Sequence, residues 1–180
     1  EILKSMRRRY NTNLFAAKVD LIRSIFPDAG ITTDLIVGFP GESEAFYQLS
    51  RDFARSMDFS DIHVFPYSPR PGTSAVLLKN RVTDNDRKQR VGEMGEIGSE
   101  SFRRFRLGQS GSRRPVLWES RLPARSHLET RKASAGVWSG LTDNYIRVHA
   151  ESEVDLGNTV TEVLLSNMGA SGGSVAVTFK

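Results

Sequence analysis

The stretch Thr32-Thr33-Asp34-Leu35-Ile36-Val37-Gly38-Phe39-Pro40-Gly41-Glu42 decides the fold of the first half of the chain. Residues 31–37 are β-branched and end in a run that is apolar on both faces, which predicts a parallel strand covered by helices. The glycines and the proline that follow end this strand, and Ser43 is a suitable cap for a helix that continues to about Met57. Residues 61–65 predict a second strand. Strand, helix and strand in this order predict a right-handed parallel unit of an α/β sheet.

Helices are predicted on both sides of this unit. The first runs from about Asn13 to Phe26 with Thr12 as its cap, and Pro27 follows it. Residues 84–105 predict a surface helix, which we expect to be kinked or frayed at its three glycines. Asp84 is the expected cap of that helix. Because a parallel sheet of two strands does not make a domain, we expect further strands of this sheet to precede residue 1.

The second half of the chain has a different composition. From Gln109 onward, Gly, Ser and Arg are frequent, and short β-type runs lie between turn residues. These runs predict a small antiparallel β barrel. The expected fold class is therefore α/β plus all-β, with residues 1–108 forming the α/β part and residues 109–180 the barrel. The runs are residues 116–118, 145–148, 160–165 and 175–179.

The overall composition excludes several classes of protein. The chain has 180 residues, of which 38% are hydrophobic, and this fraction excludes a disordered tail. Its mean hydropathy is -0.36, and the absence of a long apolar run or a signal-peptide pattern leads us to expect a cytoplasmic protein with no membrane contact. There is no cysteine, so this chain cannot supply thiolate ligands to zinc or to an iron–sulfur cluster.

Positive charge is concentrated in one segment. Residues 103–132 hold nine of the 25 Lys and Arg residues and only two acidic residues. Such a local excess is typical of a surface that binds a phosphate backbone, although a solvated charged face is the alternative. The candidate RNA-binding residues are Arg113, Arg114, Arg121, Arg125, Arg131 and Lys132. Trp118, Trp138 and Tyr145 could stack on bases, but a tryptophan in so small a barrel could equally belong to its core.

Functional groups in an α/β sheet lie at the carboxyl ends of its strands, and two loops here follow such ends. Asp34 lies within the first strand, where a carboxylate needs a partner, and the alternative to a ligand is a neighbouring backbone or hydroxyl group. His63 is expected to be a core histidine. The three histidines are too scattered to predict a metal site.

Three ordered motifs make the chain resemble the radical S-adenosylmethionine (SAM) methylthiotransferases. The motifs are residues 3–10 (LKSMRRRY), residues 32–42 and residues 63–73 (HVFPYSPRPGT). Residues 109–180 are similar to the family's TRAM domain, a small β barrel that binds tRNA. The resemblance implies that residues 1–108 are the C-terminal part of a radical SAM partial (β/α) barrel.

The chemistry implied by the resemblance uses SAM and two [4Fe–4S] clusters to place a methylthio group on an unreactive carbon. The family's cluster cysteines precede residue 1 of this sequence, so the chain looks like a C-terminal piece that is inactive alone and needs the missing N-terminal part of the same protein. Arg8 matches a position where a guanidinium pairs with the methionyl carboxylate, unless residues 7–9 are only a solvated helix end. Asp34 matches a carboxylate that bonds the ribose hydroxyls or the amino group. Gly38, Phe39, Pro40 and Gly41 would pass beside SAM, and Phe65 and Pro66 would lie near the adenine.

Three substrates are known for this family: threonylcarbamoyladenosine in tRNA, isopentenyladenosine in tRNA, and an aspartate of a ribosomal protein. Residues 63–68 are most similar to the threonylcarbamoyladenosine branch, and residues 68–73 to the tRNA branches. We therefore expect modification of threonylcarbamoyladenosine 37 of tRNA. A noncatalytic RNA-binding module is the alternative from another class, and an upstream reading frame with cysteines would favour the enzyme.

Overall fold

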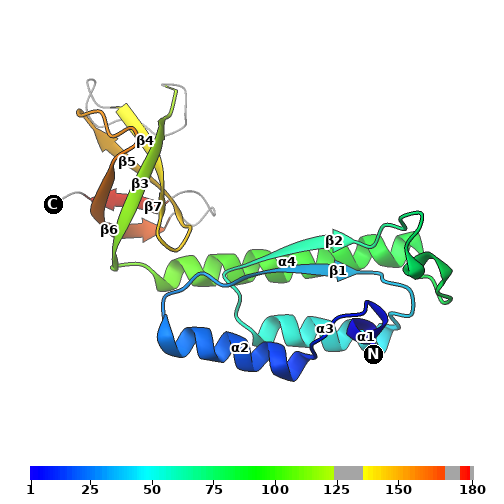
Figure 1. Cartoon of the computed structure of the whole chain (residues 1–180). Helices are drawn as coiled ribbons and strands as arrows, with labels where there is room; N and C mark the ends of the chain where they lie inside the picture. Colours follow the sequence, from blue (N-terminus) through cyan, green and yellow to red (C-terminus); the bar gives the residue numbers. More distant parts are fainter. Residues whose placement is uncertain (124–135, 169–174, 179–180) are drawn as a thin grey trace. The chain divides into compact units, whose positions relative to one another are not determined.

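A computed structural model describes residues 1–123, 136–168 and 175–178 of the chain. The chain divides into two compact units, Glu1–Phe105 and Arg106–Lys180, which are described separately. The first contains the following elements: α1 (Ile2–Ser5), α2 (Thr12–Ile25), β1 (Thr32–Val37), α3 (Glu44–Ser56), β2 (Asp61–Pro66), a 3₁₀ turn η1 (Ser74–Leu77), and α4 (Asp84–Gly108), whose last three residues fall in the second unit (Figure 1).

The predicted strand–helix–strand unit is present. β1 and β2 pair in parallel, and α3 connects them (Figure 1). The Ser43 side chain accepts a hydrogen bond from the Phe46 N–H, as expected for the cap of α3. The cap of α2 was predicted one residue late, because Asn11 and not Thr12 accepts the Leu14 N–H. An asparagine oxygen serves this role as well as a threonine hydroxyl, so the sequence does not separate the two positions.

The core of the first unit lies on one face of the two-stranded sheet. Val19 of α2, Tyr47 and Ala54 of α3, and Met94 of α4 form one cluster with apolar residues of the sheet. Val37 of β1 is among those residues and is almost fully buried. Three helices therefore cover this face. Because the buried side chains come from elements far apart in the sequence, they hold the unit together.

The opposite face of the sheet is open in the described residues. Thr32, Asp34 and Ile36 of β1 are exposed, and the residues between them are partly or fully buried. The expectation that helices cover both faces is wrong for the described chain. The apolar ending of the strand was misleading, because a period-two alternation of burial needs only one covering layer.

α4 is continuous through its glycines, so the predicted kink is absent. A Cβ atom on Gly98 would lie 3.1 Å from the carbonyl oxygen of Ile62 in β2, which shows how closely helix and strand approach there. Packing against the sheet compensates the low helix propensity of this glycine. The cap was also misassigned, because the hydroxyl of Thr83, and not Asp84, accepts the Asp86 N–H.

The second unit is a small closed β barrel. Its strands are β3 (Arg113–Arg121), β4 (Gly136–Thr142), β5 (Arg147–Ser152), β6 (Val160–Met168) and β7 (Val175–Thr178), in the order β3-β4-β5-β7-β6 (Figure 1). All described pairings are antiparallel except β5 with β7, which is parallel and departs from the predicted antiparallel barrel. Two tryptophans lie in the barrel interior: Trp118, which is fully buried, and Trp138, which is 7% exposed.

None of the helices described by the structure has the length and apolar character required to cross a membrane.

Candidate ligand-binding face and the loop beside it

The open face of the sheet presents polar and apolar side chains in two adjacent pairs. Asp34 of β1 lies opposite His63 of β2 in the parallel register, and Ile36 lies opposite Phe65. Ile36 is 37% exposed and Phe65 is 49% exposed. Because paired residues in a sheet point to the same side, a polar pair is followed by an apolar pair toward the carboxyl ends of the strands.

Asp34 and His63 are both exposed, and no described residue forms a hydrogen bond or an ion pair with either side chain. The prediction that His63 is a core histidine is therefore wrong for the described chain. The structural alternative for Asp34, a bond to a neighbouring backbone or hydroxyl group, is also absent among the described residues. Both groups are free to contact a ligand.

The loop after β1 makes a tight turn that requires glycine. Gly38 has φ +75°, and a Cβ atom at this position would lie 2.8 Å from Cγ of Arg87. Both the backbone conformation and the close side chain disfavour any larger residue. Phe39 is buried, and its ring packs edge-on against Tyr67 with the ring centres 5.2 Å apart. The loop is thus anchored to the segment that follows β2.

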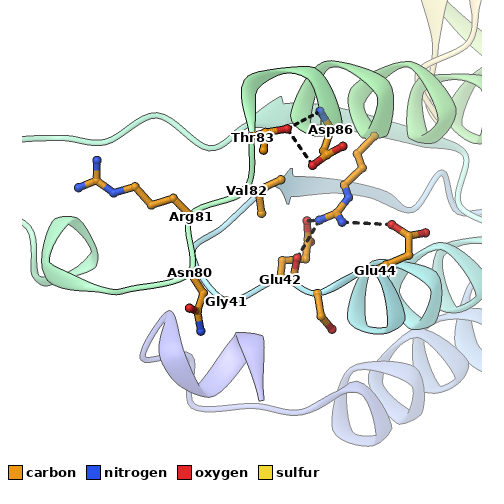
Figure 2. Close-up of a pocket in the computed structure, with 10 residues that line it drawn as sticks. Gly41, Glu42, Glu44, Asn80, Arg81, Val82, Thr83 and Asp86 are labelled. Atoms are coloured by element: carbon orange, nitrogen blue, oxygen red, sulfur yellow. Dashed lines mark hydrogen bonds and ion pairs between the residues drawn. The ribbon is translucent and has the colours of Figure 1, made fainter.

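Glu42 fixes this loop from within. Its Oε2 accepts the Gly38 N–H at 2.6 Å and also binds Nη1 of Arg90 at 2.8 Å. The same guanidinium donates to the Glu42 carbonyl oxygen at 2.9 Å and to Oε2 of Glu44 at 3.1 Å (Figure 2). The side chains of Glu42 and Arg90 are 3% and 8% exposed. A buried ion pair of this kind is tolerated because each partner makes further bonds, Glu42 with the Gly38 N–H and Arg90 with the Glu42 carbonyl oxygen and Glu44.

Tyr47 extends this network along α3 and α4. The Arg90 guanidinium lies 4.9 Å from the centre of the Tyr47 ring, and the Tyr47 hydroxyl donates to Oε2 of Glu93 at 3.0 Å. Burial, and then the bond to Glu93, raise the pKa of the Tyr47 hydroxyl. The hydrogen bond from Gln89, followed by that from Tyr47, lowers the pKa of Glu93. Tyr47 is thus held neutral and Glu93 charged.

An open pocket of about 370 Å³ lies beside the loop. Figure 2 shows Gly41, Glu42 and Glu44 on one side and the segment from Asn80 to Thr83 on the other. The Gly41 N–H donates to the Asn80 carbonyl oxygen at 2.9 Å, which joins the two sides. No group of His, Cys, Asp or Glu in the described part of the chain is arranged to hold a metal ion.

The structure distributes the predicted SAM residues between the open face and the loop. Asp34 and Phe65 share the open face, and Pro66 follows Phe65 at the exposed end of β2. Gly38, Phe39 and Pro40 are buried and Gly41 is partly buried, so these four residues contribute mainly backbone to the surface. Arg8 is exposed beyond α1, and no described contact joins its side chain to the other predicted residues. Glu42, Arg90 and His63 were missed as site residues.

The predicted RNA-binding arginines of the barrel differ in their surroundings. Arg113 is exposed, with Nη1 3.9 Å from Oε1 of Glu162. The Arg114 side chain is largely buried. Its Nη2 donates to Oε1 of Gln109 at 2.9 Å, and its Nη1 lies 3.5 Å from Oδ2 of Asp143. Arg121 is exposed. Arg125, Arg131 and Lys132 lie outside the described residues.

The candidate stacking residues also differ. Both tryptophans are core residues, and Nε1 of Trp118 donates to the Thr161 hydroxyl at 2.8 Å. Tyr145 is 80% exposed at a turn with φ +66°. Of these three aromatic residues, only Tyr145 offers its ring face to a ligand.

Comparison with known proteins identifies the class. No family model matches the chain, but the chain is homologous to tRNA methylthiotransferases of two kinds, as the three motifs led us to expect.

The chain is 40% identical over 119 residues to the threonylcarbamoyladenosine tRNA methylthiotransferase MtaB of Thermotoga maritima, covering 66% of this chain and 27% of that protein. It is 31% identical over 168 residues to the MtaB of Bacillus subtilis, covering 93% of this chain and 36% of that protein. The tRNA-2-methylthio-N(6)-dimethylallyladenosine synthase of Maricaulis maris is 32% identical over 163 residues, covering 91% of this chain and 34% of that protein. The chain thus spans about a third of the length of these relatives.

Proposed function

We propose that this chain is the C-terminal part of a radical SAM tRNA methylthiotransferase that adds a methylthio group to C2 of threonylcarbamoyladenosine 37 of tRNA. The observation that carries the proposal is the similarity to the Bacillus subtilis MtaB over 93% of the chain. The sequence of residues 63–68 supports the same branch. A cytoplasmic location is proposed with it, as the site of the tRNA pool.

The residues of the first unit are suited to one part of this chemistry. When bound, SAM and the two clusters would supply the radical and the sulfur. The open face fits the adenosyl group of SAM, because Phe65 offers an apolar surface for a base and Asp34 accepts hydrogen bonds from hydroxyl or amino groups. The chain does not fit an iron–sulfur cluster, since it has no cysteine. The cluster ligands are proposed to come from the N-terminal part of the same protein.

The second unit is proposed to bind tRNA as a TRAM domain. Arg113 and Arg121 are exposed on β3, where they can meet phosphates, and Tyr145 can stack on an unpaired base. Arg114 is better placed to support the barrel than to bind RNA, because it is occupied by Gln109 and Asp143.

Isopentenyladenosine is the second candidate substrate, because the dimethylallyladenosine synthase of Maricaulis maris is similar at nearly the same identity and coverage. The experiment is expression of the complete gene in a host that lacks its tRNA and ribosomal-protein methylthiotransferases, followed by mass spectrometry of tRNA nucleosides and of ribosomal proteins. We expect 2-methylthio-threonylcarbamoyladenosine to appear. The 2-methylthio derivative of isopentenyladenosine would assign the second branch, and a modified ribosomal protein the third. No new modification at all would support a noncatalytic RNA-binding module.

Replacement of Asp34 tests the cofactor site. Asp34→Asn in the complete, reconstituted enzyme should weaken SAM binding by about 1–3 kcal/mol, the usual effect of losing a charge-assisted hydrogen bond. Titration calorimetry measures the change. Unfolding should be unaffected, because the side chain is exposed and unpaired among the described residues. Unchanged affinity with a lower melting temperature would instead show a structural role.

A further inference from the structure

The open face of the β1–β2 sheet carries a second polar group that the predicted site does not include. His63 lies opposite Asp34 in the parallel register, on neighbouring strands about 4.8 Å apart. Its imidazole is exposed, and no described residue bonds to it. The face therefore presents an imidazole and a carboxylate side by side, with both available to an outside molecule.

The apolar pair next to them narrows the kind of molecule that fits. Ile36 and Phe65 lie two residues further along their strands, a step of roughly 6.6 Å. A purely apolar cover would leave Asp34 and His63 without hydrogen bonds, which is unfavourable in a buried place. If only water covered the face, the large apolar side chains of Ile36 and Phe65 would stay exposed side by side. A molecule with a flat apolar ring and a polar part a few ångströms away satisfies both pairs.

We propose that His63 is a further ligand-binding residue of this face, and that its imidazole bonds a polar group of an adenine nucleoside whose base lies on Ile36 and Phe65. The proposal rests on the proposed function, which supplies the nucleoside. Two sources share this chemistry: the adenosyl group of SAM and the target adenosine of the tRNA. An imidazole suits either, because one nitrogen donates a hydrogen bond and the other accepts one.

The experiment uses the complete enzyme with its clusters reconstituted and compares His63→Ala with His63→Gln. Gln keeps a hydrogen-bonding group near the position of Nε2. The matched control is Thr32→Ala, which removes an exposed polar side chain from the same face at the amino end of β1. One arm measures the equilibrium dissociation constant for SAM by calorimetry. The other measures kcat and KM with tRNA, and thermal unfolding is recorded for every variant.

We expect His63→Ala to raise either the dissociation constant for SAM or the KM for tRNA by roughly three- to tenfold, the effect of one lost hydrogen bond. His63→Gln should recover part of this loss. Thr32→Ala should change each of these constants by less than about twofold, because it removes no proposed contact with the ligand. A change in the dissociation constant for SAM assigns His63 to the cofactor. A change in KM for tRNA, with SAM binding intact, assigns it to the target base.

Two results would overturn the inference. In the first, both constants are unchanged in His63→Ala, whether or not the melting temperature falls. In the second, Thr32→Ala has the same effect as His63→Ala, which would indicate general loosening of the strand. If His63→Ala does not fold, His63→Gln decides by the same criteria. The unsubstituted enzyme alone tests the proposed function. If it neither binds SAM nor modifies tRNA, the proposed function is refuted, and the inference with it.

Discussion

Oε2 of Glu42 accepts two hydrogen bonds, one from the Gly38 N–H and one from the Arg90 guanidinium. Glu42→Ala would remove both bonds and leave Arg90 charged in a buried place. We predict a loss of about 3–5 kcal/mol in the free energy of unfolding, as when one partner of a buried pair is removed. Denaturant unfolding of the complete protein measures it.

Glu44 is the matched control, since it binds the same guanidinium but its side chain is 66% exposed. Glu44→Gln should lower stability by only about 0–1 kcal/mol, because solvent screens the pair. Equal losses in the two variants would contradict a special role for the buried carboxylate.

The residues of the site were only partly predictable. Asp34 and the glycines stood out, since a carboxylate in a strand and a Gly-Phe-Pro-Gly turn are unusual locally. Glu42 did not stand out, because an acidic residue beside a helix start has an ordinary explanation in the helix dipole. Its partner Arg90 lies 48 positions away, and such a pairing becomes visible only in three dimensions. His63 was misassigned because the open face was not foreseen.

Gly98 allows α4 to approach β2, and this gives a prediction about the element as a whole. Gly95→Ala should stabilise the protein by about 0.5–1 kcal/mol, because helix propensity rises and the added Cβ meets open space. Gly98→Ala should lack this gain and fall about 1–3 kcal/mol below Gly95→Ala, since its Cβ would press on Ile62. Thermal unfolding of both variants tests the difference. Equal stabilisation would show that α4 can move away from β2 at no cost.

The bond between Tyr47 and Glu93 links α3 to α4 in a way that depends on pH. The pKa of Tyr47 is raised in the folded state from an ordinary value of 10.0, so its contribution is full below pH 10 and is lost as the pH rises through the folded pKa. We predict that stability falls above pH 10 and falls less steeply in Tyr47→Phe. Melting temperatures measured between pH 8 and about 11 check this. Parallel curves would contradict it.

Elements with strong local signals were predicted well, and those that depend on tertiary packing were not. α3 begins at its predicted cap, and the two strands pair as expected. Within α3, the four-residue spacing of Leu49, Phe53 and Met57 suggests one shared face, yet Leu49 is 65% exposed. Successive steps of four residues rotate away from a fixed direction, so Tyr47 and Ala54 point to the core instead. β4 was missed because its glycines and serine weaken a strand pattern.

On the scale of the whole molecule, we predict that tRNA binding depends steeply on salt. Each phosphate contact should contribute a slope of about -0.7 to -0.9 in log affinity against log salt concentration. Arg113→Ala combined with Arg121→Ala should make the slope shallower by up to about 1–2 units, with little effect on the preference among tRNAs. Filter binding by the complete protein across a salt series measures the slope.

Arg55→Ala is the control for this series, because it removes an equally exposed charge from the first unit. An unchanged slope in the Arg113 and Arg121 double variant would mean that the basic segment is only a solvated face. The chain contains both the helix-covered parallel strands and the small β barrel that its change in composition led us to expect. That the α/β part is the end of a radical SAM barrel stays a prediction.

The hydrogen bond from Gly38 to Glu42 should also slow the rate at which this loop opens. Loop amides usually exchange their hydrogens with water quickly, because small local openings expose them. The Gly38 amide is different, since its hydrogen bond is only 2.6 Å long and ends on a carboxylate that is itself held in a buried ion pair. Exposing it requires the Gly38 backbone to leave a carboxylate that Arg90 holds in place. Its deuterium uptake should therefore be as slow as that of the strand beside it, and a small molecule meeting this loop would find the turn already formed.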